Sequence, residues 1–340
     1  MRGSGTWSFV FAVAALALAM LGLALGSVHV PFSEVMSSLM HAGSTGTYTT
    51  IVRQVRLPEV ITAATAGAGL AASGLIMQTL FRNPLAGPSV LGISSGASLG
   101  VALVMLAQPL WMLLPVPREV LVIGASFGGA VAVLLLIVLA DKRVGDGVTL
   151  LIIGLMVGYL CSAVISVLQS ASSAQALKGY VLWGMGSFAG VDMHRAAWLV
   201  IPVLLGLVAS LALIKPLNSL LLGEDYARSM GTNVQRTRRI AIWTTGVLAG
   251  TITAFCGPIA FLGLATPHVA RLFIRNNDHR ALMPATILLG MALALGCDLL
   301  VRVSGTDVPL PLNAVTSLLG APVVLWVIFS GKRWASGNAA

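Results

Sequence analysis

The feature that most constrains this chain is a series of long apolar stretches that recurs along its whole length. A membrane-spanning helix needs about 20 mostly apolar residues, and the sequence offers roughly ten such stretches separated by short polar segments. Of the 340 residues, 57% are apolar and only 9% are charged, too few to cover a water-soluble globule. We therefore predict an all-α integral membrane protein, a compact bundle of about ten transmembrane helices in one domain, residues 1–340.

The predicted spans follow one another closely. They cover residues 8–27, 58–80, 90–107, 119–140, 148–169, 196–214, 240–256, 258–272, 281–301 and 311–330. The first stretch is longer than the ~7–15 apolar residues of a signal peptide, so we interpret it as a retained span. Gly92, Gly96 and Gly100 recur at four-residue spacing. This spacing lets helices approach closely in lipid and favours a compact bundle.

Lysine and arginine indicate the orientation, because these residues are enriched in cytoplasmic loops. If the chain starts inside, 14 of the 20 basic residues lie on the cytoplasmic side: Arg2, Arg82, Lys142, Arg143, Lys215, Arg228, Arg236, Arg238, Arg239, Arg271, Arg275, Arg280, Lys332 and Arg333. The other six lie outside: Arg53, Arg56, Arg118, Lys178, Arg195 and Arg302. We therefore predict cytoplasmic termini and a multi-pass protein of the inner (plasma) membrane. The net charge of +9 is spread over loops rather than one face, so it indicates topology and no nucleic-acid partner.

The sequence lacks the usual signatures of an enzyme. The only Gly-Lys pair, Gly331-Lys332, is followed by Arg333 rather than by the Ser or Thr of a phosphate-binding loop. ATP hydrolysis is therefore expected from a partner, with ATP and magnesium bound there and no cofactor, metal site or catalytic residue in this chain. Three cysteines lie inside apolar stretches without metal-ligand spacing, which indicates packing: Cys161, Cys256 and Cys297.

One predicted span carries a polar stripe. Its members are Tyr159, Ser162, Ser166 and Gln169, whose spacing places them on one helical face. A polar stripe is unfavourable against lipid, so it faces either neighbouring helices or a water-filled path. The sequence leaves these two interpretations open.

Two ionisable residues in apolar stretches are functional candidates, because burying them in lipid is costly. Asp298 precedes Arg302 by four residues, so the two can pair on a helix. His268 follows Pro267, where we expect a helix break and a hydrogen bond at the helix end. Both residues therefore also have purely structural interpretations.

The segment between the sixth and seventh spans, about residues 216–239, mixes apolar residues with charges and is punctuated by Gly223 and Gly231. A cytoplasmic segment of this composition suits docking into a groove of another protein. A loop that is merely solvated would not need its leucines. The residues predicted to form the docking surface are Gly223, Tyr226, Ala227, Met230 and Gly231.

Five ordered blocks resemble the FecCD-type permeases of ATP-binding-cassette (ABC) importers, over nearly the whole chain. They are Arg53-Gln-Val-Arg56-Leu57-Pro58, Gln78-Thr-Leu-Phe81-Arg82-Asn83-Pro84-Leu85-Ala86, Leu91-Gly92-Ile-Ser-Ser-Gly96-Ala97, Gly257-Pro258-Ile-Ala-Phe-Leu-Gly263-Leu-Ala-Thr-Pro267-His268 and Leu319-Gly320-Ala321-Pro322. Two positions depart from the family pattern: Glu59 replaces a basic residue, and Asn313 replaces the glycine of Leu-Pro-Val-Gly.

The resemblance implies a type II ABC importer permease that moves a metal chelate by alternating access, with a ferric siderophore ranked ahead of haem and cobalamin. It implies three protein partners besides membrane lipid: an ATPase subunit, an extracytoplasmic solute-binding protein and a second permease subunit, identical or related. The path between the two permeases would be lined largely by spans five and ten. Span five is the one that carries the polar stripe.

The resemblance also implies roles for further residues. The segment around Gly223 and Gly231 would rest on the ATPase. Three arginines would receive acidic residues of the binding protein: Arg53, Arg56 and Arg302. Anchoring to lipid headgroups is the alternative for these arginines. The cytoplasmic gate would lie between spans four and five, at Asp141, Gly145, Asp146 and Gly147.

Two other classes of membrane protein fit less well. An ion-coupled secondary transporter would carry coupling groups in symmetry-related halves, but only Asp298 and His268 qualify and their positions are not symmetric. An intramembrane enzyme would need a nucleophile–base or metal constellation, which the sequence does not contain.

Overall fold

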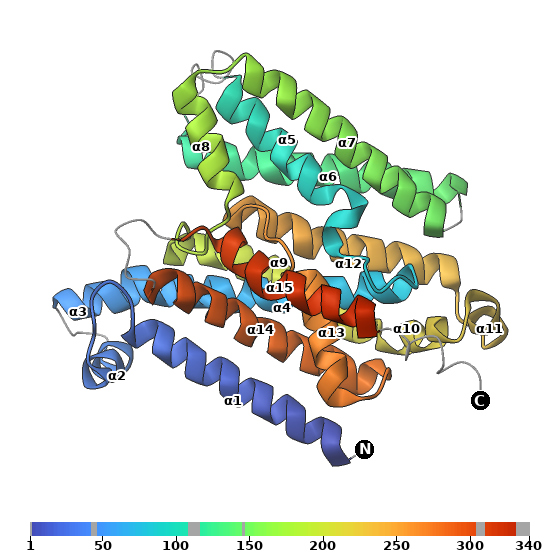
Figure 1. Cartoon of the computed structure of the whole chain (residues 1–340), viewed down its shortest axis with the longest axis horizontal. Helices are drawn as coiled ribbons and strands as arrows, with labels where there is room; N and C mark the ends of the chain where they lie inside the picture. Colours follow the sequence, from blue (N-terminus) through green and yellow to red (C-terminus); the bar gives the residue numbers. More distant parts are fainter. Residues whose placement is uncertain (1, 42–45, 108–115, 145–146, 304–309, 331–340) are drawn as a thin grey trace.

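The computed structural model describes residues 2–41, 46–107, 116–144, 147–303 and 310–330, and within these ranges the chain forms helices and no β-strand (Figure 1). Among the described residues, seven helical stretches are long and apolar enough to cross a membrane. They comprise α1 (Arg2–Ala24), α4 (Leu57–Leu80) with the residues before it, α6 (Arg118–Val144), α7 (Gly147–Ser170), α9 (Met193–Ala212), α12 (Val234–Cys256) and α14 (His279–Val303).

Three shorter apolar helices complete the set: α5 (Ile93–Leu106), α13 (Leu262–Ile274) and α15 (Leu312–Ser330). Together the long and short helices match the predicted spans, so an all-α membrane protein with about ten spanning helices is confirmed. The remaining elements are α2 (Phe32–Met40), α3 (Thr47–Thr50), the π-helical turn η1 (Ile51–Arg56), the 3-10 turn η2 (Pro88–Leu91), α8 (Ala174–Gly184), α10 (Ile214–Leu221) and α11 (Glu224–Ser229).

Helix α4 is the centre of the bundle. In α4 and the residues before it, 83% of the most apolar stretch is buried, compared with 17% in α7. Small residues make this possible: a Cβ added at Gly290 of α14 would lie 2.5 Å from the carbonyl oxygen of Gly67 on α4. The backbones of α4 and α14 therefore touch, as small residues allow in lipid. The surface of α7, by contrast, is left for lipid or for another subunit.

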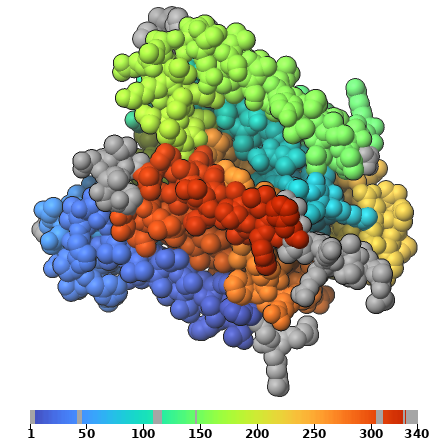
Figure 2. Space-filling model, viewed as in Figure 1, coloured from blue at the N-terminus to red at the C-terminus, as the bar shows by residue number. Residues whose placement is uncertain are grey.

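The helices form two groups on either side of α4 and α12. Helices α5 to α8 lie together on one side, whereas α1 and α14 lie on the other, and α15 crosses the front (Figure 1). Pairing within these groups is extensive, with α5 packed on α6 and α1 packed on α14. In the space-filling view, α5 (teal) lies deeper than its neighbours, between α7 (green) and α15 (red) (Figure 2).

The short helices cap opposite ends of the bundle. Helices α2 and α3 lie at one end, which we call the α2–α3 end, and α10 and α11 lie at the other, the α10–α11 end (Figure 1). Helix α1 starts and α15 finishes at the α10–α11 end (Figure 1). An even number of crossings requires this arrangement.

The expected break at Pro267 is wrong. Helix α13 begins after Phe261, whose φ is 63°, and runs through Pro267 to Ile274. Proline cannot donate to the Gly263 carbonyl four residues earlier, but this carbonyl packs against Gly74 of α4, where a side chain would collide with it. Tertiary packing thus accommodates the missing helix bond.

Candidate translocation path and coupling surface

Hydroxyl groups line a groove between α5 and α7. The groove has a volume of about 340 Å³ and is lined by Ser94, Ser95, Ser98, Ser162, Ile165, Ser166, Tyr180 and Pro258. The three serines of α5 fall at near-helical spacing and so face the same side as Ser162 and Ser166 of α7. Tyr180 closes the groove from α8. The groove is rich in hydrogen-bonding groups, and its lining residues are uncharged.

The predicted polar stripe of α7 lies partly in this groove. Ser162 and Ser166 line it, and Ser166 donates to the Ser162 carbonyl at 2.9 Å. Tyr159 is 63% exposed on the same helix, whereas Gln169 is half-buried. The stripe therefore faces an open surface of this chain and not its packed interior.

The segment predicted to dock a partner forms α10 and α11 with their flanking turns. Gly223 and Gly231 have φ angles of 118° and 80°, which favour glycine. Between them, Tyr226 is 51% exposed and Met230 60% exposed, whereas Ala227 is fully buried. Tyr226 and Met230 can therefore meet a partner directly. Ala227 instead packs α11 against the rest of the bundle.

The predicted gate lies beside this segment. Gly147 is the first residue of α7, and Asp141 is 9% exposed near the end of α6. The other two gate residues, Gly145 and Asp146, lie outside the described residues. Asp141 pairs with Arg238 of α12 at 3.5 Å, and Arg238 also pairs with Glu224 of α11 at 2.5 Å. The gate region and the α11 segment therefore share one arginine.

A polar network joins α10, α14 and α4 at the same end of the bundle. The Asn218 side-chain amide donates to Asp278 at 2.6 Å, and its oxygen accepts from the His279 backbone N–H at 2.8 Å. The His279 ring lies 2.8 Å from both Asn218 and the Thr79 hydroxyl. The backbone N–H of Arg280, followed by Asn218, lowers the pKa of Asp278 below its usual range. The network therefore holds a carboxylate at the start of α14.

His268 has a structural environment on α13. Its Nε2 lies 2.7 Å from the Pro84 carbonyl oxygen and 3.4 Å from Gln78. Arg271 donates to the Gln78 amide oxygen at 2.6 Å. This buried histidine therefore joins α13 to the end of α4, mid-helix rather than at the expected helix end.

At the α2–α3 end, the two arginines of η1 point in different directions. Arg53 is half-buried and donates to the carbonyls of Ser38, at 2.5 Å, and His41, at 2.8 Å. Arg56 is 4% exposed and donates to the carbonyls of Leu23, at 2.8 Å, and Val28. The two guanidinium groups thus tie η1 to the last turns of α1 and α2 and to the residues that follow them.

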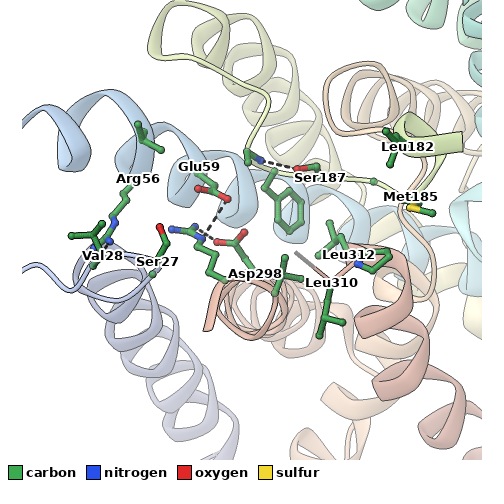
Figure 3. A pocket seen from close by; sticks show the side chains of 18 of the residues that line it. Ser27, Val28, Arg56, Glu59, Leu182, Met185, Ser187, Asp298, Leu310 and Leu312 are labelled. Atoms are coloured by element: carbon green, nitrogen blue, oxygen red, sulfur yellow. Dashed lines mark hydrogen bonds and ion pairs between the residues drawn. The ribbon is translucent and has the colours of Figure 1, made fainter. Parts of the chain in front are cut away.

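Arg302 lies in a charged cluster with the carboxylates of Glu59 and Asp298, both labelled in Figure 3. Its Nε is 3.3 Å from Glu59 of α4, its Nη2 pairs with Asp298, and its Nη1 donates to the Gly22 carbonyl at 3.1 Å. The expected Asp298–Arg302 pair is therefore present. With Arg56, this cluster forms one wall of a cavity of about 620 Å³, whose other wall includes Leu182, Met185, Phe188, Leu310 and Leu312.

Sequence reasoning missed the structural role of Asn313. Its side chain donates to the carbonyls of Pro258, at 2.7 Å, and Gly184, at 3.0 Å, and accepts from the Ala260 N–H at 2.9 Å. Asn313 therefore joins the start of α15 to the end of α8 and to the segment after α12. The replacement of the family's glycine by asparagine at this position was the feature of the sequence that could have indicated this role.

The cysteines are free and buried, as their positions in apolar stretches predicted: Cys161, Cys256 and Cys297. Over the described ranges, the side chains of histidine, cysteine and acidic residues form no group of three able to hold a metal ion.

Comparison with known proteins agrees with this arrangement. The chain is 34% identical to the vitamin B12 import system permease protein BtuC of Klebsiella pneumoniae over 332 residues, 97% of this chain and 96% of the relative. It is 37% identical to BtuC of Escherichia coli O9:H4 over 286 residues, covering 83% of this chain and 84% of the relative.

A solved structure described as an inward-facing conformation of a metal-chelate type ABC transporter aligns with 95% of this chain and 98% of its own, with a TM-score of 0.83 and 28% identity. The model of the FecCD transport family matches residues 14–330. These similarities extend over nearly the whole chain. The chain therefore belongs to the FecCD transport family and is a permease subunit of an ABC importer.

Proposed function

We propose that this chain imports a metal chelate by alternating access. The observation that carries the proposal is the groove between α5 and α7, where five serine hydroxyls and the side chain of Tyr180 line the surface. Such a lining suits a large cargo whose metal ion is enclosed by an organic ligand, because a bare cation would need charged or carbonyl ligands.

Cobalamin is the cargo to test first. The curated relatives are named for vitamin B12 import, which favours cobalamin over the ferric siderophore that the sequence ranked first. A ferric siderophore and haem are the next two candidates. All three carry polar groups at their periphery, and these groups can form hydrogen bonds with successive serine hydroxyls as the cargo passes.

The proposed assembly holds two permease subunits, identical or related, in the inner membrane with both termini in the cytoplasm. The α10–α11 end then faces the cytoplasm, where an ATPase that binds ATP and magnesium contacts Tyr226 and Met230. The proposed gate lies where α6 ends and α7 begins, beside this surface. The exposed face of α7 supports this arrangement, because it leaves Ser162 and Ser166 open toward a second subunit.

The proposed dock for the solute-binding protein is the α2–α3 end, with Arg53, Arg56 and Arg302. Arg53 is the more accessible of the η1 arginines, and it donates to two backbone carbonyls. Carboxylates of the binding protein would replace these neutral acceptors with charged ones. Exchanging Arg53 for Glu should weaken the association most at low salt.

The decisive experiment is reconstitution in lipid vesicles with the cognate ATPase and binding protein. ATP-dependent uptake of cobalamin, a ferric siderophore and haem is measured side by side, and vesicles with a hydrolysis-deficient ATPase are the control. Uptake of one chelate that requires ATP and the binding protein is the expected result. Uptake driven by an ion gradient without ATP would instead place the chain among secondary transporters.

A further inference from the structure

Arg238 connects two parts of the chain that the proposed function treats separately. It lies in α12, only 2% exposed. One terminal nitrogen is 2.5 Å from Glu224, the first residue of α11, and the other is 3.5 Å from Asp141 near the end of α6. We call these three residues the Arg238 cluster. Asp141 and Glu224 are 83 residues apart (224 − 141), so only the tertiary fold brings them to one guanidinium.

The three members differ in their access to water. The side chains of Arg238 and Asp141 are 3% and 8% exposed, whereas that of Glu224 is 35% exposed. The Arg238–Asp141 pair is thus held away from water, where separating two opposite charges costs far more than it does in solution. Glu224, the first residue of α11, is more open to water. The cluster is therefore buried on the α6 side and reaches the surface on the α11 side.

The neighbours of Glu224 are the residues proposed to meet the ATPase. Gly223 precedes it with a φ of 118°, a conformation that favours glycine. Tyr226 and Met230 follow on the exposed side of α11. Any displacement that the ATPase imposes on these residues therefore also moves the carboxylate of Glu224.

We propose that Arg238 is a positioning residue that transmits movement of α11 to the end of α6, and through it to the gate. The inference rests on the proposed function, because it needs an ATPase at α11. Arginine suits this task, since its planar guanidinium holds two carboxylates in a fixed relative geometry. When α11 shifts, Arg238 follows Glu224, and Asp141 follows Arg238 because their buried charges resist separation.

The test uses the full complex in lipid vesicles and measures the cargo imported per ATP hydrolysed. Asp141→Asn and Glu224→Gln each remove one carboxylate charge and keep the side-chain shape. Each should still assemble with the ATPase but lower the import-to-hydrolysis ratio by about fivefold or more, the usual range for coupling between sites. The ratio in the double variant should fall no further than in the more strongly affected single variant, because both changes break the same connection between α11 and α6.

Arg195→Gln is the matched control. Arg195 also forms an ion pair with α6, at 2.8 Å from Glu119, but at the opposite end of the bundle and in solvent. Its loss should leave the ratio unchanged. Arg238→Lys is the second variant: lysine keeps the charge but cannot hold two carboxylates in one plane, so the ratio should again fall.

Three outcomes would overturn the inference. They are a wild-type ratio in both carboxylate variants, losses that multiply in the double variant, and failure of all cluster variants to assemble, which would assign the cluster a purely structural role. Failure of the proposed function looks different, because wild-type vesicles would then import no chelate with ATP. Intact ATPase assembly in Met230→Glu would remove the ATPase contact at α11 that the inference needs, and would leave the proposed import of a chelate untouched.

Discussion

The guanidinium of Arg302 on α14 lies 3.3 Å from the carboxylate of Glu59 on α4. The same guanidinium pairs with Asp298 one turn earlier on α14. Two carboxylates from two helices thus share one cation at the α2–α3 end (Figure 3). Glu59 stands where the family pattern has a basic residue, and Arg56 lies close enough to act on it as a second cation.

Replacing Arg302 should therefore destabilise the protein strongly. Arg302→Gln leaves Glu59 and Asp298 without their cation, and breaking a buried pair in this way costs about 3–5 kcal/mol. The measurement is the thermal unfolding midpoint of the purified protein in detergent. Arg53→Gln is the control: Arg53 donates to the backbone carbonyls of Ser38 and His41, which are neutral acceptors, so its shift should be smaller. Equal shifts would contradict a special role for the Arg302 cluster.

Met230→Glu should abolish co-purification of the ATPase. Met230 is 60% exposed on the proposed docking surface, and a charge placed in an apolar contact without a partner is costly. Met193→Glu is the matched control, because Met193 is 49% exposed but lies at the start of α9, at the other end of that helix from α10. Co-purification that survives Met230→Glu would move the ATPase contact elsewhere.

Cysteines at Ser162 and Ser166 should react with membrane-impermeant thiol reagents, at rates that change with the nucleotide bound to the ATPase. Both positions line the groove, and the native cysteines are buried, so background labelling should be low. Val167→Cys is the control. Val167 is 67% exposed but lies on a different face of α7 from the two serines, the face that we expect to contact lipid. State-independent labelling, or none, would assign the stripe to packing.

Asn313→Ala should lower stability by about 1–3 kcal/mol, the cost of leaving buried polar groups without partners. It removes bonds to Gly184, Pro258 and Ala260 at once. Asn276→Ala is the control, because Asn276 is exposed and accepts one local bond from Asp278. Thermal unfolding of both variants tests this, and a shift for Asn313→Ala no larger than that of the control would refute its connecting role.

Local patterns in the sequence determined the spans and the close pairs. Runs of apolar residues specify a helix in lipid regardless of what surrounds it, since the backbone must satisfy its own hydrogen bonds there. The Asp298–Arg302 pair was predictable for a similar reason: residues four apart on a helix are neighbours in any fold. The alternation of glycine and charge around Gly223 likewise located α11.

Only the tertiary structure decided which distant groups share a partner. Nothing in the chain order joins Glu59 to Arg302 or Asp141 to Glu224, because the geometry of a buried cluster depends on how the helices cross. For the same reason, the sequence did not predict that α13 continues through Pro267, because this depends on the packing of Gly263 against Gly74. Helix formation in lipid is a local matter of backbone bonding, whereas partner choice among buried polar groups is settled by packing over the whole bundle.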